Sequence, residues 1–499
     1  MPPTRSPEAA PRAVLLVALL APVAAAMFAA AGVAAASGSE GDATPSAERL
    51  AGAAVCPPRA GGRTELVNVS TEGQQADARV LRATVSAKGR FIAFSSAATN
   101  LVPGDTNRYA DVFVRDLVTR TTTRVSVSSA GGQGNAASYF PSISADGRMI
   151  AFRSLAKNLV EDDTNAVEDV FLHDMLSGVT QRVSVGSAGQ QANGASITTS
   201  ISADGTVVAF TSAATNLVPG DRNNVNDVFV RDTTYGQTIR VTAGPRGEAN
   251  GVSEGSGISS DGNLVTFRSF ATNLVRADGN GLADDFVRDW VARTTERVNV
   301  STSGAEANGV TFRGAISGDG RRVAFRSRAT NLVDGDTNEA LDVFEHDRVT
   351  GVTRRISIAT SGAQADGRAL SPAARAASFM SRAFLSATGR YATFGSRAPN
   401  LVAGDTNRAA DVFVHDLVSR RTARVSVTAA GTQANDDSFV VGVSGDGSVI
   451  VFVSSASNLV SNDTNDRRDA FVRLRALSRP APPCIWPPVP QPLRKPRPR

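Results

Sequence analysis

The residues best suited to chemistry in this 499-residue chain are aspartates and asparagines in a recurring pattern. Seven segments carry Asp-x-Asn-x-x-x-Asp, each a few residues after an Asn-Leu-Val tripeptide. Oxygen ligands two residues apart, followed by a carboxylate, suit a hard cation such as Ca²⁺. The seven sets are Asp105/Asn107/Asp111, Asp163/Asn165/Asp169, Asp221/Asn223/Asp227, Asp278/Asn280/Asp284, Asp336/Asn338/Asp342, Asp405/Asn407/Asp411 and Asp463/Asn465/Asp469.

A second interpretation of these loops needs no metal. Three side chains are fewer than the roughly six to eight oxygens that Ca²⁺ takes, so backbone carbonyls and water would have to complete the shell. Asn tolerates left-handed backbone and Asp accepts from loop N–H groups, so the same residues can serve as a turn scaffold. We favour the scaffold and keep calcium as the alternative, the one cofactor that the sequence suggests.

Other residues of chemical interest follow the repeat as well. His173, His346 and His415 stand where other copies have an arginine, which predicts a partly exposed polar position and not a catalytic one. Six copies place an Asp after a strand, where it would cap a turn. These are Asp116, Asp174, Asp232, Asp289, Asp347 and Asp416. The sequence offers no catalytic triad, histidine metal cluster, phosphate-binding Gly loop or nucleophilic Cys, so we expect a protein that is not an enzyme.

These motifs lie in a unit of four short strands, a to d. In the copy at residues 140–184 the strands are predicted at 140–144, 149–153, 169–173 and 180–185, rich in Val, Ile or Phe and bounded by turn residues. A Ser-x-x-Gly landmark begins each a–b turn, and successive landmarks are 58, 58, 57, 58, 69 and 58 residues apart. Seven copies of a four-stranded unit predict an all-β, seven-bladed propeller.

The ends of the repeat predict how the ring closes. Residues 64–70 match strand d, yet no a, b or c strand precedes them, and the seventh copy (a 440–444, b 449–453, c 470–473) has no d strand. The orphan strand, residues 65–70 in particular, is therefore expected to complete the last blade, which removes an exposed sheet edge. Cys56 and Cys484 flank these two strands, which predicts a disulfide across the closure.

Four segments follow from composition. Residues 1–36 read as a cleaved export signal, residues 37–63 as a flexible leader, residues 64–478 as the propeller, and residues 479–499 as a Pro-rich basic tail. The alternative for the apolar run at 13–36 is an uncleaved membrane anchor. We therefore expect secretion, or anchoring at the cell surface. Residues 368–378 form an insertion before the sixth copy.

Charge argues against nucleic acid as a partner. The formal net charge is +5, but four basic residues lie within the last twenty positions and the signal adds one more positive charge. The body between is neutral, whereas binding to nucleic acid needs a clustered basic surface.

The pattern SADGRxIAFxS…DVFVRD…TxRVSV resembles the WD40-like (PD40) propeller repeats of the TolB type, over residues 64 to about 477. This chain departs from TolB in its longer units, in having seven units where TolB has six, and in lacking a separate N-terminal α/β domain. The resemblance implies a propeller fold and, by analogy, a role in protein partnering at the cell envelope.

Strand alternation places the b–c and d–a loops on one face, which is also the more elaborate one. We expect a monomeric, non-catalytic binding or scaffolding module that takes a protein or polysaccharide ligand there. The alternative is an extracellular propeller lyase or hydrolase that acts on glycans with acids near the ring axis. An enzyme should break the repeat with a unique polar cluster, and from the sequence the insertion is the one strong break.

Overall fold

The computed structural model of the chain describes residues 62–366 and 382–475. The predicted export signal, nearly all of the leader, Cys56, Cys484, the 368–378 insertion and the basic tail lie outside the described residues. The described elements are all β strands, and no helix among them is long and apolar enough to cross a membrane.

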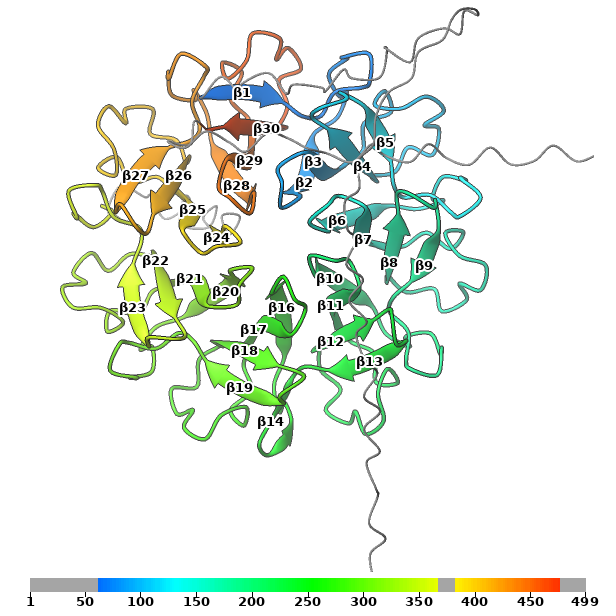
Figure 1. Ribbon diagram of the computed structural model, residues 1–499, viewed down its shortest axis with the longest axis horizontal. Helices are drawn as coiled ribbons and strands as arrows, with labels where there is room; N and C mark the ends of the chain where they lie inside the picture. The colour runs from blue at the N-terminus through cyan, green and yellow to red at the C-terminus, as the bar shows by residue number, and fades with distance from the viewer. Residues whose placement is uncertain (1–61, 367–381, 476–499) are drawn as a thin grey trace, which may run out of the picture. The chain divides into compact units, whose positions relative to one another are not determined.

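The described residues form seven four-stranded antiparallel sheets arranged in a ring (Figure 1). The a strands, nearest the axis, are β2 (Val80–Val85), β6 (Ser138–Ile143), β10 (Ser196–Ile201), β16 (Ser253–Ile258), β20 (Thr311–Ile316), β24 (Phe384–Leu385) and β28 (Ser438–Val443). The b strands are β3 (Phe91–Ser96), β7 (Met149–Ser154), β11 (Val207–Ser212), β17 (Leu264–Ser269), β21 (Arg322–Ser327), β25 (Tyr391–Ser396) and β29 (Val449–Ser454).

The c strands are β4 (Asp111–Asp116), β8 (Asp169–Asp174), β12 (Asp227–Asp232), β18 (Asp284–Asp289), β22 (Asp342–Asp347), β26 (Asp411–Asp416) and β30 (Asp469–Leu474). The outer d strands are β5 (Thr122–Arg124), β9 (Thr180–Arg182), β13 (Gln237–Arg240), β19 (Thr294–Arg297), β23 (Val352–Arg355), β27 (Arg421–Arg424) and β1 (Arg63–Leu66). A small extra hairpin, β14 (Ala243–Gly244) with β15 (Gly247–Glu248), lies in the connection between the third and fourth blades. The predicted seven-bladed propeller is confirmed.

The ring closes as the orphan strand predicts. β1 pairs antiparallel with β30, with Arg63 opposite Leu474 and Leu66 opposite Phe471, and it completes the seventh blade. The bounds differ from the expected 65–70: the ladder ends at Leu66, and Val69 instead bridges Gln75. Other d strands are also shorter than predicted. After each of them the backbone leaves the ladder early and forms a tight d–a loop, which an isolated bridge holds.

A stacked phenylalanine pair lies at the centre of every blade. Phe94 of β3 and Phe113 of β4 have ring centroids 5.6 Å apart, and both are fully buried. The other pairs are Phe152/Phe171, Phe210/Phe229, Phe267/Phe286, Phe325/Phe344, Phe394/Phe413 and Phe452/Phe471. Each offset pair contributes about 0.5–1.5 kcal/mol beyond the burial of its area. Strands b and c are thus buried on both faces, as their apolar runs predict.

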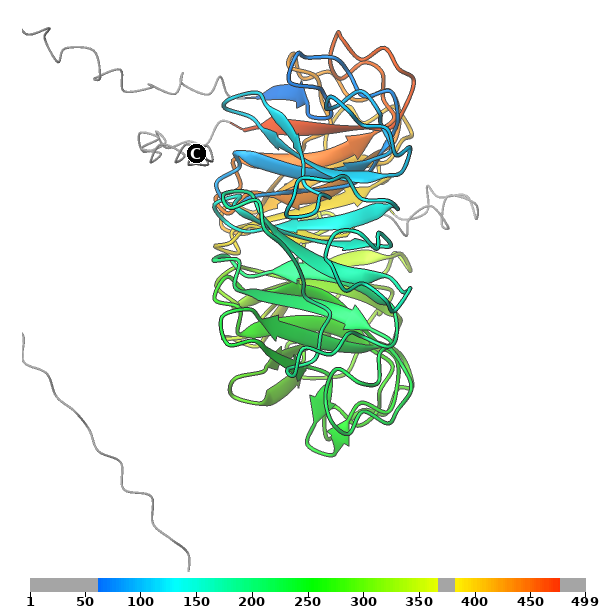
Figure 2. The same ribbon diagram turned by 90° about the vertical axis from the view of Figure 1, so that its right-hand side faces the viewer.

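The a–b turns fit one blade against the next. Gly147 has φ +83°, and a Cβ there would lie 2.1 Å from the ring of Phe91 in the preceding blade. Glycine is required at this position both by the backbone conformation and by the close approach. The strands run between two loop-bearing faces (Figure 2).

Candidate functional site

The b–c and d–a loops share one face, as strand alternation predicts. Asn107, in the b–c loop of the first blade, donates through Nδ2 to the carbonyl of Gly134 in the following d–a loop at 3.0 Å. In the seventh blade Asn465 makes the same contact with the carbonyl of Ala76. We call this the loop face; the a–b and c–d hairpins form the hairpin face.

The asparagines of the five blades between repeat the contact, each with an alanine carbonyl at 2.8–3.1 Å. The pairs are Asn165 with Ala192, Asn223 with Ala249, Asn280 with Ala307, Asn338 with Ala365 and Asn407 with Ala434. The Oδ1 atom of each of these amides accepts from the backbone N–H two residues on, in the manner of an Asx-turn.

The role of these asparagines therefore differs from that of the calcium ligands considered above. A calcium ligand would offer its amide oxygen to the ion. In Asn165, Asn223, Asn280, Asn338 and Asn407 that oxygen already accepts from the loop backbone, while the amide N–H groups bind the neighbouring loop. The oxygen end of the amide thus shapes its own b–c loop, and the nitrogen end joins that loop to a d–a loop.

The Asp-x-Asn loops are also closed by an arginine. In the first blade the Arg124 guanidinium lies 3.3 Å from Asp105 and 3.6 Å from Asp111. Asp111 accepts further from Ser126 Oγ and from Asn107 Nδ2, at 2.5 and 3.0 Å. Asn107 Oδ1 in turn accepts from the backbone of Tyr109. The amide thus presents N–H groups, which cannot bind a metal, to the carboxylate.

Six blades have this arginine at the same place on strand d, beside both loop acids. The sets are Arg124 with Asp105 and Asp111, Arg182 with Asp163 and Asp169, Arg240 with Asp221 and Asp227, Arg297 with Asp278 and Asp284, Arg355 with Asp336 and Asp342, and Arg424 with Asp405 and Asp411. The guanidinium lies where a cation shared by both carboxylates would sit, so the donor set of these six blades does not fit Ca²⁺ well. We interpret the loops as scaffolds, and calcium binding stays the alternative to be tested.

In the fourth blade a glutamate lies close to both loop aspartates. Ligand atoms of Asp278, Asp284 and Glu306 lie within 4.8 Å of one another. Arg297 pairs with all three carboxylates, so the cluster already holds a cation.

The seventh blade lacks the arginine, because β1 supplies Leu66 at that position. Gln75 takes over and donates Nε2 to Asp463 and Asp469 at 2.9 and 2.8 Å. Asn68 donates to the second oxygen of Asp469 at 2.5 Å. The acids of this loop are thus satisfied by amides from the closing segment.

Burial raises the pKa of several aspartates in these networks. Desolvation, together with the charge of Asp111, raises the pKa of Asp105 to about 6. Burial also raises the pKa of Asp227 and of Asp469 to about 6. These groups stabilise loops at neutral pH only while their N–H partners stay in place.

The three histidines are buried, and the prediction of a partly exposed position is wrong. His173 Nδ1 lies 2.8 Å from Thr180 Oγ1, and His346 and His415 make the same contact with Thr353 and Thr422. The threonine lies opposite on strand d and shields the ring. Burial lowers the pKa of all three histidines, so they are neutral structural groups.

The aspartates after strand c cap turns, as predicted. Asp116 accepts from the backbone of Val118 and pairs with Arg90 at 2.6 Å.

The strongest break in the repeat lies at the ring axis and is absent from the sequence-based predictions. Three blades carry an arginine at the third position of the aligned strand a, and three carry one at the fifth position of strand b. With Arg468 before β30 and three acids they form what we call the axial cluster: Arg82, Arg153, Arg268, Arg313, Arg326, Arg382, Arg468, Glu168, Glu254 and Asp285.

Strand register places the cluster on the loop face. Arg82 pairs with Ser95, Tyr139 with Arg153, and Glu254 with Arg268, all at the ends of strands a and b that meet the b–c loops. An alignment of the seven copies could have identified these arginines from the sequence. It puts Arg153, Arg268 and Arg326 where other copies have Ser95, Thr211, Gly395 or Val453.

Two of the three acids are paired. Glu168 lies 3.1 Å from Arg153, and Glu254 lies 2.5 Å from Arg313 of the next blade. Asp285 replaces the valine or alanine of the other c strands, and only 1% of its surface is exposed. Burial raises its pKa to about 8, although Arg268 acts in the opposite direction.

The arginines of different blades repel one another across the axis. Burial, then the charges of Arg313 and Arg82, lower the pKa of Arg382 to about 9. Burial and the charges of Arg313, Arg468 and Arg153 lower the pKa of Arg82. The cluster holds more arginines than acids, which makes it a concentrated positive site.

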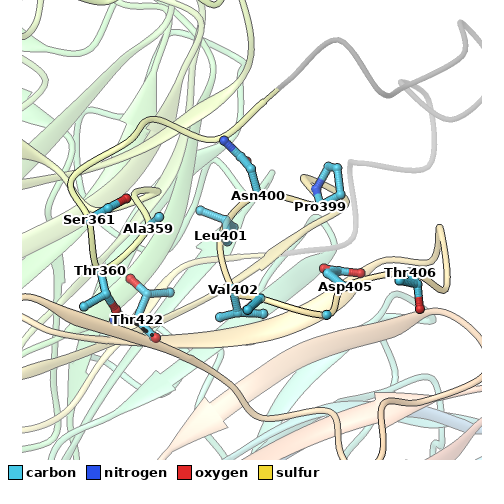
Figure 3. A pocket seen from close by; sticks show the side chains of 12 residues that line it. Ala359, Thr360, Ser361, Pro399, Asn400, Leu401, Val402, Asp405, Thr406 and Thr422 are labelled. Atoms are coloured by element: carbon cyan, nitrogen blue, oxygen red, sulfur yellow. Dashed lines mark hydrogen bonds between the residues drawn. The ribbon is translucent and has the colours of Figure 1, made fainter.

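A separate pocket of about 560 Å³ lies on the loop face between the fifth and sixth blades (Figure 3). It is lined by residues 359–361, 399–406 and Thr422. Its one charged lining residue, Asp405, already pairs with Arg424 at 3.4 Å. The axial cluster is the better candidate site.

No family model matches the chain, and no curated protein matches it. Several solved structures are similar. An oligogalacturonate lyase in complex with manganese has 13% identity and a TM-score of 0.49, with 83% of this chain and 96% of that chain covered. A putative TolB from Agrobacterium tumefaciens has 15% identity and a TM-score of 0.37, covering 74% and 98%. The β-propeller domain of the Trilobed protease from Pyrococcus furiosus has 11% identity and a TM-score of 0.46, covering 79% and 95%. The resemblance to TolB-type repeats is confirmed at the level of the fold, which the seven blades themselves establish.

Proposed function

We propose that this protein is a non-catalytic binding propeller that acts outside the cell and takes an anionic ligand at the ring axis of its loop face. The observation that carries the proposal is the axial cluster, in which arginines of six blades outnumber the acids. An anion placed there would offset the repulsion among the guanidinium groups and accept their charge-assisted hydrogen bonds.

The propeller fold does not need these arginines. The place of Arg82, Arg313 and Arg382 on strand a is filled elsewhere by Phe140, Thr198, Gly255 and Val440. Gathering like charges in a partly buried place costs free energy, so a cluster that the repeat can do without points to a ligand. Arginine suits this task because its planar fork binds carboxylate, sulfate or phosphate groups in pairs of hydrogen bonds.

The proposal of a binding protein in place of an enzyme rests on the state of the axial acids. Glu168 and Glu254 are each held by an arginine, and Asp285 lies beneath the surface. A general acid or base has to reach the reacting atoms. The alternative, a lyase or hydrolase acting on glycans, would have to use one of these three residues.

Location and assembly belong to the same proposal. The predicted export signal at 1–36 supports secretion, or attachment to the cell surface if that segment is retained. We propose that the protein works as a monomer, because the ring closes within one chain and leaves no unpaired blade edge at the closure of the described residues.

Polyanion binding by matched variants tests the proposal. Arg82→Thr and Arg153→Thr install the residue type that the third blade has at the same two positions, Thr198 and Thr211. Each should weaken binding of labelled dextran sulfate or polyglutamate about tenfold, the cost of one charge-assisted contact. Arg222→Thr, in the b–c loop of the third blade, removes one positive charge at a position away from the axis and should leave binding unchanged. Equal binding by all three variants and the parent would reject the axial site.

A further inference from the structure

Resting on the proposed function, we propose that the ligand is an acidic polysaccharide whose sugars stack on aromatic side chains while their carboxylate or sulfate groups meet the axial arginines. The basis is that the arginines of the axial cluster are paired with aromatic rings at two places in the ring.

The first place lies between the first and second blades. The guanidinium groups of Arg82 and Arg153 lie 4.8 and 4.3 Å from the centre of the Phe140 ring, one from each blade. Tyr139 lies 5.7 Å from Arg153. Two cations, one from each blade, therefore lie against the same aromatic ring.

The second place lies between the fourth and fifth blades. Arg268 lies 5.0 Å from the ring of Phe270 and 5.7 Å from that of Phe312, and Arg326 lies 5.3 Å from Phe312. Phe270 is 54% exposed. The first and third blades have Ala97 and Ala213 at that position, so the fold does not require the ring.

The two places face each other across the ring. The inner strands β2 and β6 lie on the opposite side of the axis from β16 and β20 (Figure 1). The charge of Arg313 reaches Arg82, which means that the two sides are electrostatically coupled. A linear ligand that crosses the axis can contact both places at once.

The mixture of groups favours a polysaccharide over other polyanions. The C–H faces of sugar rings pack on aromatic side chains, and sugar hydroxyls can donate to glutamates such as Glu168 and Glu254. Single-stranded DNA carries phosphates but no hydroxyl groups along its backbone, so it offers these glutamates no such donor. An acidic peptide such as polyglutamate can bind the arginines, but it has no sugar ring to stack on Phe270.

Two substitutions separate the charge from the stacking surface. The probes are alginate (carboxylate), dextran sulfate (sulfate), neutral dextran, polyglutamate and a single-stranded DNA oligonucleotide, each labelled and measured by fluorescence anisotropy with the full chain. Phe270→Ala should weaken binding of alginate or dextran sulfate about fivefold to tenfold and leave polyglutamate unchanged. Arg82→Thr should weaken every polyanion that binds, and neutral dextran should not bind. Val252→Ala, at an exposed position beside Phe270, is the control for loss of apolar surface alone.

The outcomes distinguish this inference from the proposed function. If alginate binds and dextran sulfate does not, the acidic group is a carboxylate; the reverse result assigns a sulfate. If polyglutamate or DNA binds more tightly than both polysaccharides, or if Phe270→Ala has no effect on either, the polysaccharide inference is overturned while an anion site at the arginines stands. If Arg82→Thr changes no binding, the proposed function itself fails.

Discussion

Leu66 lies opposite Phe471 at the point where the other six blades place an arginine opposite a phenylalanine. The difference follows from closure: the strand that completes the last blade comes from the other end of the chain. Without the arginine, the acids Asp463 and Asp469 depend on Gln75 and Asn68, which belong to the closing segment. In the other six blades this network stabilises one loop. In the seventh blade it also joins the two ends of the propeller and so stabilises the closed ring.

The first prediction concerns this closing contact. Gln75→Ala should lower the free energy of unfolding by about 1–3 kcal/mol, because the buried Asp469 and the partly buried Asp463 both lose a donor. Thermal or urea unfolding measures the change. Gln433→Ala is the matched control in the sixth blade, where Arg424 still pairs with both acids. A loss at Gln433 as large as at Gln75 would contradict the special role of the seventh blade.

The second prediction concerns the arginine of an ordinary blade. Arg424→Met leaves Asp405 and Asp411 buried without their cation and should cost about 3–5 kcal/mol, as for a broken buried ion pair. Adding Asp405→Asn should recover part of that loss.

Arg148→Met supplies the contrast. Its pair with Asp174 is half exposed and should cost less than about 1 kcal/mol. Equal losses at Arg148 and Arg424 would mean that burial does not set the strength of these pairs.

The third prediction is that the melting midpoint is the same in calcium and in EDTA. Arginine or amide N–H groups already face the loop acids, so the folded state should gain nothing from the ion. A bound ion at one hundred times its dissociation constant would add about 2.7 kcal/mol per site, which differential scanning calorimetry would detect. A calcium-dependent rise that EDTA reverses, and that magnesium does not reproduce, would establish the calcium loops instead.

Much of the fold could be predicted from the sequence because each blade repeats locally. The landmark at Ser144 and the Asp that six copies share, Asp116 in the first, indicate turns within one unit, and the orphan strand indicates how the ring closes. The axial cluster could not be read in the same way, because Arg82 and Arg313 belong to different blades and meet only once the ring forms. The burial of His173 does not follow from its own strand pattern, because its partner Thr180 lies on the adjacent strand, seven residues on.

The fourth prediction concerns pH. The pKa of Asp285 is raised to about 8, whereas an unfolded aspartate titrates near about 4, so the folded chain binds the extra proton between these values. Asp285 therefore makes stability fall as pH rises from about 4 to about 8. Asp285→Asn should reduce this fall, so that the variant gains most relative to the parent at pH 8.

Melting midpoints at pH 5 and pH 8 measure the effect, with Asp162→Asn on an exposed loop as the control. Other buried acids with pKa values near 6 titrate in both proteins, and the difference between parent and variant isolates Asp285. Parallel pH profiles for the parent and Asp285→Asn would show that this carboxyl is not protonated in the folded state.

The last prediction is the disulfide between Cys56 and Cys484. Both cysteines lie outside the described residues, but the neighbouring chain ends meet: the N–H of Gly62 donates to the carbonyl of Leu474 at 2.8 Å. Non-reducing peptide mapping of the exported protein should recover one intramolecular pair. Because the bridge would span most of the chain, its loss in Cys56→Ser should cost up to about 4–5 kcal/mol in the loop-entropy description, without loss of the fold. A reductant should lower the melting midpoint of the parent to that of the variant and leave the variant unchanged. Two free thiols, or a pair between two chains, would refute the bridge and leave strand pairing and the Gln75 contacts as the closure.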